Sequence, residues 1–371
     1  MLNRLKDLIS NKGGQGVAIE LGPEKINVVQ LKKQGADVKL LNLCSADVPA
    51  GVFEEGRIVN QAELADLISA TLKDNKITAK FVCTAVPMRE AITRLIPLPA
   101  ELSDAELHDM VLNHEAALYL PYPREEVDID YQKLELITDE DGLDKMQVML
   151  AATRREITDS YIETFQRAGL AVKVLEINSF SLLRTMREQL RQFAPQEAVV
   201  LIDIEFDSTE IAIIVNGVPQ FNRTVSIGTQ QMLEALGSGM NLPSIRNSDI
   251  LQGINIPDIP VSNITTVGDD ETIGPGMDVL MRVLADLADE IRRSIDFYSN
   301  HSSNLRIEQL LLAGPGGGLG QLDLFFTQRL GVPATQIDPV ASLGIETNLD
   351  IPLMQRPGLG IILGLGMREV N

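Results

Sequence analysis

VAIELGPEKINVVQLK at residues 17–32 and LIDIEFDSTEIAIIV at residues 201–215 are two versions of one pattern. Each is an apolar, β-branched run that carries one acid, followed by a polar turn and a second apolar run, which predicts a β-hairpin. The aligned positions are Glu20 with Asp203, Gly22 with Glu205, and Ile26 with Thr209. The chain therefore contains the same local unit twice.

A third strand is predicted after each hairpin, at Val38–Leu43 and Val218–Val225. The second of these follows Asn216-Gly217, a strong signal for a tight hairpin turn. An acid at a strand end beside a tight turn is also a place where a fold can hold a metal–phosphate group. The repeated three-stranded unit thus predicts two lobes that clamp a phosphate between them.

Length and charge agree with a two-lobed cytoplasmic protein. At 371 residues the chain exceeds the size at which single cores usually stop growing, so two or more domains are expected. A formal charge of −20 argues against nucleic acid as a partner. Only Cys44 and Cys83 are present, which excludes a disulfide framework and fits a reducing compartment. No segment reaches the roughly 18 apolar residues that span a bilayer.

The N-terminal segment MLNRLKDLISNKG has apolar residues at helical spacing with basic residues between them. We expect a short helix that packs on its own domain or frays in solvent. A weak membrane-surface or partner-binding helix is the open alternative, because so short a helix cannot anchor firmly by itself.

Periodicity and capping signals predict the remaining elements. Predicted helices are 61–73, 103–118, 155–168, 179–193, 278–301 and 321–330, and predicted strands are 80–86, 126–137, 145–153, 172–176 and 305–314. The change of texture after Pro87 indicates an inserted α+β subdomain that ends near Leu150. Residues 229–250 are expected to be helical in pieces, and residues 251–277 to form a loop. GLGIILGLGM at 358–367 predicts a closely packed last helix.

The strand at 305–314 runs into the glycine-rich turn PGGGLG. Glycines let backbone N–H groups approach a phosphate or a nucleoside without a Cβ in the way. The turn matches neither the dinucleotide-binding pattern nor the P-loop. Together with the two acidic hairpins, however, it indicates a nucleotide-binding clamp.

With these features the chain resembles the actin/Hsp70/sugar-kinase ATPases, and within them the PilM family of the type IV pilus assembly platform. The resemblance covers nearly the whole length. Besides the two hairpins it rests, in order, on the stretches LIPLPAELSDAELHDMVLNHEAALYLPYPREEVDIDYQ, MLAATRREITDSYIETFQRAGL, EINSFSLLR, NRTVSIG, DEIRRSIDFY and LLLAGPGGGLGQLDLFFTQRLGVP.

This resemblance implies an α/β, actin-like two-lobed ATPase fold with an FtsA-like inserted α+β subdomain. The implied division is a first-lobe subdomain at 1–82 and 151–195, the insertion at 83–150, a second-lobe subdomain at 196–235 and 305–340, a distal second-lobe subdomain at 236–304, and a return to the first lobe at 341–371.

The resemblance also implies sites for ATP and Mg2+ between the lobes. Phosphate-binding positions would be Glu20, Gly22, Pro23, Glu24, Lys25, Asn27, Asp203, Glu205, Asp207, Ser208, Thr209 and Gly228. Adenosine-binding positions would be Gly314, Pro315, Gly316 and Gly317, and the metal-binding position would be Asp203. No catalytic residue is assigned.

The chain departs from the family pattern where phosphate would bind. The family usually has D-x-G at both hairpins, whereas this chain has Glu20-Leu21-Gly22 and Asp203-Ile204-Glu205. The lysine of the family's first loop falls at Asn27. Five acids lie on the two hairpins against Lys25 as the only nearby cation in the sequence, so we expect weakened ATP binding and slow or absent hydrolysis.

The partners that the resemblance implies are the cytoplasmic N-terminal peptide of a PilN-like protein, the PilN/PilO inner-membrane complex, and the pilus motor and platform proteins. The protein would be cytoplasmic and peripheral to the inner membrane through a partner; self-association is left open. Aromatic and leucine side chains beside a rigid turn suit peptide capture. We therefore expect the partner site near His114–Tyr131, at Leu118, Tyr119, Leu120 and Tyr122, unless these residues only close the subdomain core.

Two alternatives belong to other functional classes. A sugar-kinase-type phosphotransferase would need a base beside a substrate hydroxyl and a well-formed magnesium site, and no substrate motif is visible. An FtsA-like filament protein would end in a polar linker and a membrane-binding helix, whereas this chain stops at GLGMREVN.

Overall fold

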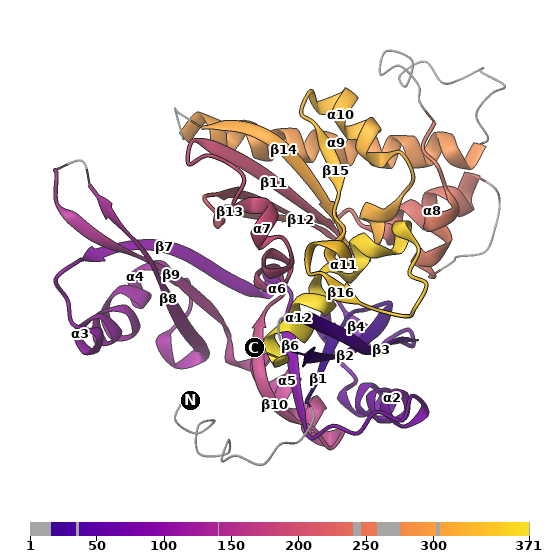
Figure 1. Cartoon of the computed structure of the whole chain (residues 1–371), viewed down its shortest axis with the longest axis horizontal. Helices are drawn as coiled ribbons and strands as arrows, with labels where there is room; N and C mark the ends of the chain where they lie inside the picture. The colour runs from indigo at the N-terminus through magenta and orange to yellow at the C-terminus, as the bar shows by residue number, and fades with distance from the viewer. Residues whose placement is uncertain are drawn as a thin grey trace.

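The computed structural model describes residues 16–34, 37–139, 141–239, 246–257, 275–301 and 305–370. Figure 1 shows two sheet-based lobes and a smaller subdomain that projects beside them. The helix considered for the N-terminal segment lies outside the described residues, as do residues 258–274 of the expected loop.

The first lobe is built on a six-stranded sheet. Its order is β10 (Ala171–Ile177), β6 (Phe81–Val86), β1 (Gly16–Leu21), β2 (Lys25–Gln34), β3 (Asp37–Asp47) and β16 (Ile345–Glu346). Helices α2 (Gln61–Asp74) and α5 (Arg155–Arg167) cover the outer face, where Leu64, Ile68 and Phe165 are fully buried. A small hairpin of β4 (Phe53–Glu54) and β5 (Arg57–Ile58) lies beside this sheet.

The second lobe repeats the plan with five strands. Their order is β13 (Val218–Val225), β12 (Thr209–Val215), β11 (Glu197–Ile204), β14 (Arg306–Ala313) and β15 (Ala334–Gln336). The outer face packs against α8 (Thr229–Gly239), α9 (Pro275–His301) and α10 (Leu322–Leu330). The C-terminal half of the chain also contains four short described helices: η4 (Ser248–Gly253), η6 (Pro315–Gly318), α11 (Pro339–Ser342) and η7 (Leu353–Leu359).

Strand register confirms the repeat. Leu21 pairs with Ile26 across the first turn, and Ile204 pairs with Thr209 across the second, as the alignment of the two sequences predicts. Asn216 and Gly217 have φ angles of +53° and +74°, the left-handed conformations that a tight two-residue hairpin turn requires.

A shared core joins the lobes. Helices α6 (Asn178–Thr185) and α12 (Gly360–Val370) lie between the two sheets (Figure 1), and the apolar side chains around them come from both. A Cβ at Gly364 would lie 2.0 Å from the carbonyl oxygen of Ser181, so only glycine allows this approach. The predicted close packing of the last helix on the first lobe is therefore confirmed.

The projecting subdomain enters through η1 (Met88–Glu90) and holds a three-stranded antiparallel sheet ordered β7 (Ala91–Pro99), β9 (Asp144–Arg154) and β8 (Val127–Thr138). Its helical part is α3 (Asp104–Asp109), the π-helical η2 (Met110–Glu115), α4 (Ala116–Tyr119) and η3 (Arg124–Glu126). The predicted capping box at Ser103 and Glu106 is present. The predicted α+β composition of this insertion is thus confirmed.

Two predicted helices are interrupted. The helix expected from 103 to 118 contains the π-helical segment η2, and the helix expected from 179 to 193 is split by Met186 into α6 and α7 (Arg187–Leu190). The loop expected at 251–277 begins instead with residues of η4 and a β-bridge from Asn255 to Gly320. Among the described helices, none has the length and apolarity to cross a membrane.

Candidate functional site

The first hairpin turn lies between the lobes. Gly22 N–H donates to Lys25 O at 3.1 Å, which closes the turn. Glu20 and Asn27 face each other across the strands, and Asn27 Nδ2 donates to Glu20 Oε2 at 3.0 Å. Asn27, which stands at the family's lysine position, therefore supplies a hydrogen bond to the carboxylate of this hairpin.

The second hairpin turn is packed against the start of α8. Glu205 N–H donates to Ser208 O at 2.9 Å, and Thr229 N–H donates to Glu205 O at the same distance. A Cβ at Gly228 would lie 2.5 Å from the carbonyl oxygens of both Glu205 and Phe206. Gly228 is therefore needed for this backbone contact, whatever else it binds.

The glycine-rich turn lies beside the second acid. Gly314 has φ +76°, and a Cβ there would lie 2.4 Å from Ile204 O and 2.8 Å from Asp203 Oδ1. The structure thus brings together the two signals, acidic hairpin and glycine turn, that the sequence places over 100 residues apart.

The glycines after Pro315 are not open to solvent. Gly316, Gly317 and Gly318 are buried in η6. A Cβ at Gly316 would meet the Ile204 side chain at 2.3 Å, and one at Gly318 would meet Met354 O at 2.0 Å. In this arrangement η7 and the second hairpin cover the predicted adenosine-binding glycines.

Residues 246–249 of the second lobe hold the first turn across the cleft. The buried Glu24 carboxylate accepts from Ser248 N–H at 2.6 Å and from Ser248 Oγ at 2.7 and 2.8 Å. Lys25 Nζ pairs with Asp249 Oδ1 at 2.9 Å, and Arg246 Nη2 donates to Pro23 O at 2.9 Å. We call these three contacts the cleft latch.

A third cation also reaches the second lobe, from the start of the inserted subdomain. Arg89 of η1 pairs with Asp207 Oδ1 at 2.9 Å and donates to Ser208 Oγ at 3.1 Å. Its guanidinium passes so close to Gly56 that a Cβ there would lie 1.6 Å from Nη2. The prediction that Lys25 is the only nearby cation was wrong, because Arg89 and Arg246 reach the turns from segments that carry no hairpin signal.

Burial changes the charge of the acids between the lobes. Burial, with the nearby charge of Asp203, raises the pKa of Glu20 to about 7 despite the bond from Asn27. Burial also raises the pKa of Asp203 to about 7. The pKa values of Glu205 and Glu210 lie well above the usual range, because both are buried and both lie near Asp203. The ionisation of each of these acids therefore depends on the charge of the others.

Asp203 differs from its repeat partner, because the side chain that hydrogen-bonds to it is another acid, Glu205, and neither of its buried oxygens has any other partner among the described residues. Such oxygens would accept bonds from a hydrated cation, but the described residues contain no group of three or more metal-ligating side chains. A triphosphate would also have to replace the cleft latch and approach Glu205. The residues as arranged oppose tight binding of ATP with Mg2+.

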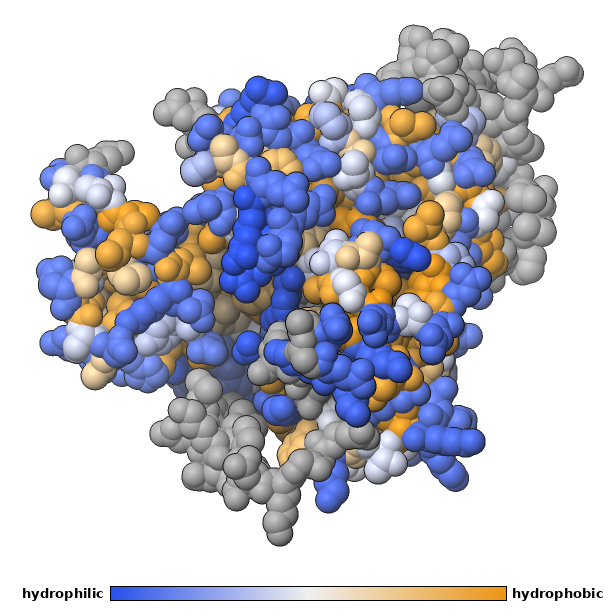
Figure 2. Space-filling view, viewed as in Figure 1, coloured by the Kyte–Doolittle hydropathy of each residue, from blue (hydrophilic) through white to orange (hydrophobic). Residues whose placement is uncertain are grey.

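The four residues predicted to bind a partner divide into two kinds. Leu118 is 76% exposed, and Tyr119 and Tyr122 are 37% and 39% exposed. Leu120 is only 9% exposed and belongs to the core of the inserted subdomain with Val111. In Figure 2 hydrophobic residues gather on the visible face of this subdomain. Leu120 therefore closes the core of the inserted subdomain, which is the alternative that the sequence left open for these four residues.

The exposed tyrosine is linked to the joint between the insertion and the first lobe. The Arg154 guanidinium lies over the Tyr122 ring, 5.6 Å from its centroid, and bonds to Glu90 at 3.2 Å. Glu90 also accepts from Arg57 at 2.9 Å. A cavity of about 230 Å³ opens at this joint, which we call the seam cavity; Val59, Glu90 and Tyr161 are among its lining residues.

Comparison with solved structures supports the fold. A PilM–PilN type IV pilus biogenesis complex matches with 25% identity and a TM-score of 0.78, covering 96% of this chain and 99% of that chain. The ethanolamine utilization protein EutJ from Carboxydothermus hydrogenoformans matches with 14% identity and a TM-score of 0.52, covering 99% and 96%. MreB5 of Spiroplasma citri bound to AMPPNP matches with 12% identity and a TM-score of 0.50, covering 96% of both chains.

These neighbours confirm the predicted actin-like fold. At the sequence level, the family described as type IV pilus assembly protein PilM matches residues 18–244, more than half of the chain. The chain belongs to this PilM family of type IV pilus assembly proteins.

Proposed function

We propose that the protein is a cytoplasmic, actin-like component of type IV pilus assembly that binds the N-terminal peptide of a PilN-like membrane protein. It would thereby link the PilN/PilO inner-membrane complex to the pilus motor. The observation that carries the proposal is the match, over nearly the full length of both chains, to a PilM–PilN complex. The neighbours favour neither a phosphotransferase nor a filament protein as the alternative.

The exposed part of the inserted subdomain is the proposed peptide site. Leu118, Tyr119 and Tyr122 offer apolar and aromatic surface beside the rigid turn, and such side chains dominate binding energy in interfaces. Arg154 connects Tyr122 to the seam cavity, so a peptide could extend from the turn to the joint with the first lobe. Leu120 is left out of this contact surface because it is buried.

Calorimetric titration with the N-terminal peptide of the cognate PilN-like protein tests the proposal. We expect Leu118→Ala and Tyr122→Ala each to weaken binding by about tenfold. Leu349→Ala is the matched control, because Leu349 is similarly exposed but lies outside the insertion. Unchanged affinity in both folded variants would place the site elsewhere, and absence of binding by the unmodified protein would contradict the function itself.

Membrane association is proposed to depend on this peptide. Liposomes that carry the PilN-like peptide should recruit the protein in a flotation assay, while bare anionic liposomes should leave it in the soluble fraction, since the chain carries a formal charge of −20. Strong recruitment by bare anionic liposomes would refute partner-mediated association.

Nucleotide binding is proposed in a weakened form. An actin-like neighbour was solved with AMPPNP, and this chain retains the hairpins and the glycine turn of the fold. The cleft latch and Glu205 oppose a bound triphosphate, so Mg2+-ATP should bind weakly, with slow or absent hydrolysis.

A further inference from the structure

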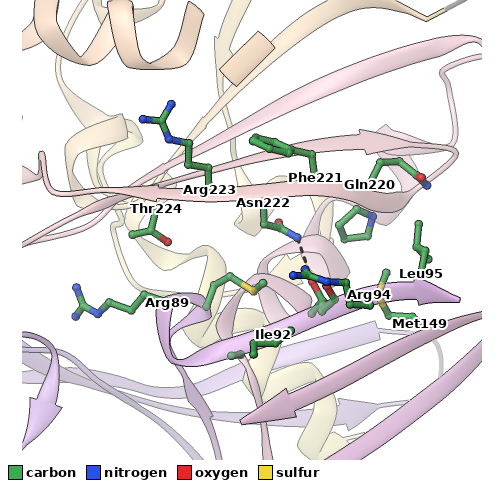
Figure 3. Close-up of a pocket in the computed structure, with 14 residues that line it drawn as sticks. Arg89, Ile92, Arg94, Leu95, Met149, Gln220, Phe221, Asn222, Arg223 and Thr224 are labelled. Carbon is green, nitrogen blue, oxygen red and sulfur yellow. Dashed lines mark hydrogen bonds between the residues drawn. The ribbon is translucent and has the colours of Figure 1, made fainter. Parts of the chain in front are cut away.

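Two sheet edges face each other between the inserted subdomain and the second lobe. Strand β7 ends the three-stranded sheet and β13 ends the five-stranded sheet, so each has a strand neighbour on one side only among the described residues. Figure 3 shows the two strands running in opposite directions past one another. A hydrogen bond from Asn222 Nδ2 to Thr93 Oγ1, 3.3 Å long, crosses between them.

A cavity of about 490 Å³ lies between these edges, and Ala91–Leu95 and Pro219–Thr224 form most of its wall. This volume falls in the range of about 300–1,000 Å³ that is typical of ligand pockets. Unpaired backbone groups on an edge strand bind an added extended chain, with alternate side chains entering pockets on either side. The geometry therefore suits a short extended peptide.

The wall of the cavity is basic in composition, and one of its arginines is not paired with a carboxylate of a described residue. It contains Arg89, Arg94 and Arg223 and no acidic residue, although the chain has a formal charge of −20. Arg89 and Arg223 are paired with carboxylates. Arg94 forms no ion pair with a described residue and donates to its neighbour's carbonyl, Thr93 O, at 2.9 Å. A bound peptide with acidic side chains would supply the missing partner.

Two buried polar atoms at the cavity also lack partners among the described residues, Arg89 Nε and Asn222 Oδ1. Buried polar groups are almost always hydrogen-bonded in native proteins, so such atoms need a partner. One is a donor and the other an acceptor, as the backbone of an inserted strand would require.

Apolar side chains complete the site. Ile92, Leu95 and Met149 line the insertion's side of the cavity. On the opposite wall the Phe221 ring points away from β7 toward α9 (Figure 3), where it lies 5.6 Å from Phe297 and 6.3 Å from Tyr298, centroid to centroid. An occupant that alternates acidic and β-branched residues would match both the arginines and these surfaces.

We propose that β7 and β13 bind an extended acidic segment of a partner protein by strand addition, at a site separate from Leu118–Tyr122. The added strand would take the place of the Asn222–Thr93 hydrogen bond. The inference does not rest on the proposed PilN-like peptide site, which lies on the helical part of the insertion. The chain's own N-terminal segment is a poor occupant, because Arg4, Lys6 and Lys12 give it the same charge as the cavity.

The probe for this site is a fluorescein-labelled nonapeptide, Gly-Glu-Val-Glu-Val-Thr-Val-Glu-Gly, titrated with the full chain by fluorescence anisotropy. Two control peptides are matched to it. One carries lysine in place of each glutamate. The other carries proline in place of the central valine, because proline has no backbone N–H to donate to a neighbouring strand. The acidic peptide should bind about tenfold more tightly than either control, and Arg94→Glu should remove that preference. Arg191→Glu, an exposed charge reversal directly after α7, should leave it unchanged.

Hydrogen exchange distinguishes strand addition from simple charge attraction. Strand addition should slow the exchange of backbone amides in β7 and β13, whereas charge attraction alone should not. Equal binding of the three peptides, no saturable binding up to about 1 mM, or unchanged binding in Arg94→Glu would overturn the proposal. Displacement of the probe by the PilN-like peptide would also overturn it, since the two sites are proposed to be separate.

Discussion

The two acid-bearing hairpins have the same register but are held by different parts of the molecule. The turn of the first hairpin is bound by the opposite lobe, through Glu24 and Ser248. The turn of the second is bound chiefly by its own lobe, where Gly228 and Thr229 pack against it. The comparison shows that a repeated backbone unit can be stabilised locally in one copy and across a domain boundary in the other.

The acids of the two hairpins differ in the same way. Glu20 receives a hydrogen bond from the amide of Asn27, whereas the side chain that hydrogen-bonds to Asp203 is a second acid, Glu205. The first copy therefore compensates its buried acid within the hairpin, and the second leaves its acid to protonation or to a ligand.

The largest expected effect comes from the local packing of the second turn. Gly228→Ala places a methyl group 2.5 Å from two carbonyl oxygens, so it should lower the free energy of unfolding by about 3 kcal/mol. Gly22→Ala is the matched change in the first turn, where the nearest contact would be 3.0 Å and the cost should be about 1 kcal/mol. Scanning calorimetry measures both; equal losses would show that the two turns are equally constrained.

Breaking the cleft latch should come next. Glu24→Ala leaves the buried Ser248 N–H and hydroxyl without their acceptor, which should weaken the closed arrangement by about 2 kcal/mol. Hydrogen exchange of residues 246–257 should rise in this variant. Asp249→Ala removes an ion pair whose carboxylate is half-exposed, so its effect should stay below about 1 kcal/mol. Unchanged exchange in Glu24→Ala would mean that other contacts hold the lobes together.

Restoring glycine in the second turn should improve nucleotide binding by a smaller amount. Glu205→Gly removes a side chain that occupies the phosphate position and that repels phosphate when it is ionised, so the affinity for Mg2+-ATP should rise about tenfold in a calorimetric titration. Glu205→Gln keeps the size of the side chain but cannot ionise. Comparing the two variants therefore distinguishes the effect of the charge from the effect of the side-chain volume. Tight binding by the unmodified protein, with turnover that Asp203→Ala abolishes, would show that these acids hold metal.

The smallest effect should be the difference between the pH dependences that the two acids give. Folding raises the pKa of Asp203 from 3.8, and that of Glu20 from 4.5, to about 7. The folded state then binds more protons than the unfolded state between these values, so the stability from these groups is present at low pH and is lost as the pH rises through about 7.

Asp203→Asn should therefore raise the melting temperature more at about pH 8 than at about pH 5. Glu20→Gln should do so less, because the Glu20 carboxylate already accepts from Asn27. Melting curves across this pH range measure the difference, and a variant of Asp203 that loses stability at the higher pH would show that the ionised carboxylate has a partner.

Sequence patterns predicted those elements of the fold that depend on residues close together in the chain. The β-branched runs and their turns gave both hairpins in the correct register, and the small residues of 358–367 predicted the packing of the last helix. The interruption at Met186 was missed, because nothing in the helical period there marks a break. The exposure of Tyr122 and the burial of Leu120 were not distinguishable, since both are apolar residues beside the same prolines.

The contacts across the cleft were beyond sequence reasoning for a different reason. Glu24 meets a serine more than 200 residues away, and Arg89 meets Asp207 from a segment without a motif. Such pairs depend on how the lobes meet, which no local period records. The sequence therefore predicted which acids line the cleft but not which groups neutralise them.

Adjacent residues Arg89 and Glu90 act as a mechanical joint. Arg89 forms an ion pair with Asp207 of the second lobe. Glu90 forms ion pairs with Arg57 of the first lobe and with Arg154 of the insertion. A load applied to the projecting subdomain therefore reaches the cleft through one peptide unit rather than through a long chain of contacts. Torque on that subdomain should either rotate the lobes with it or strain the Arg89–Asp207 pair together with the direct contacts from the insertion to β13 and its turn.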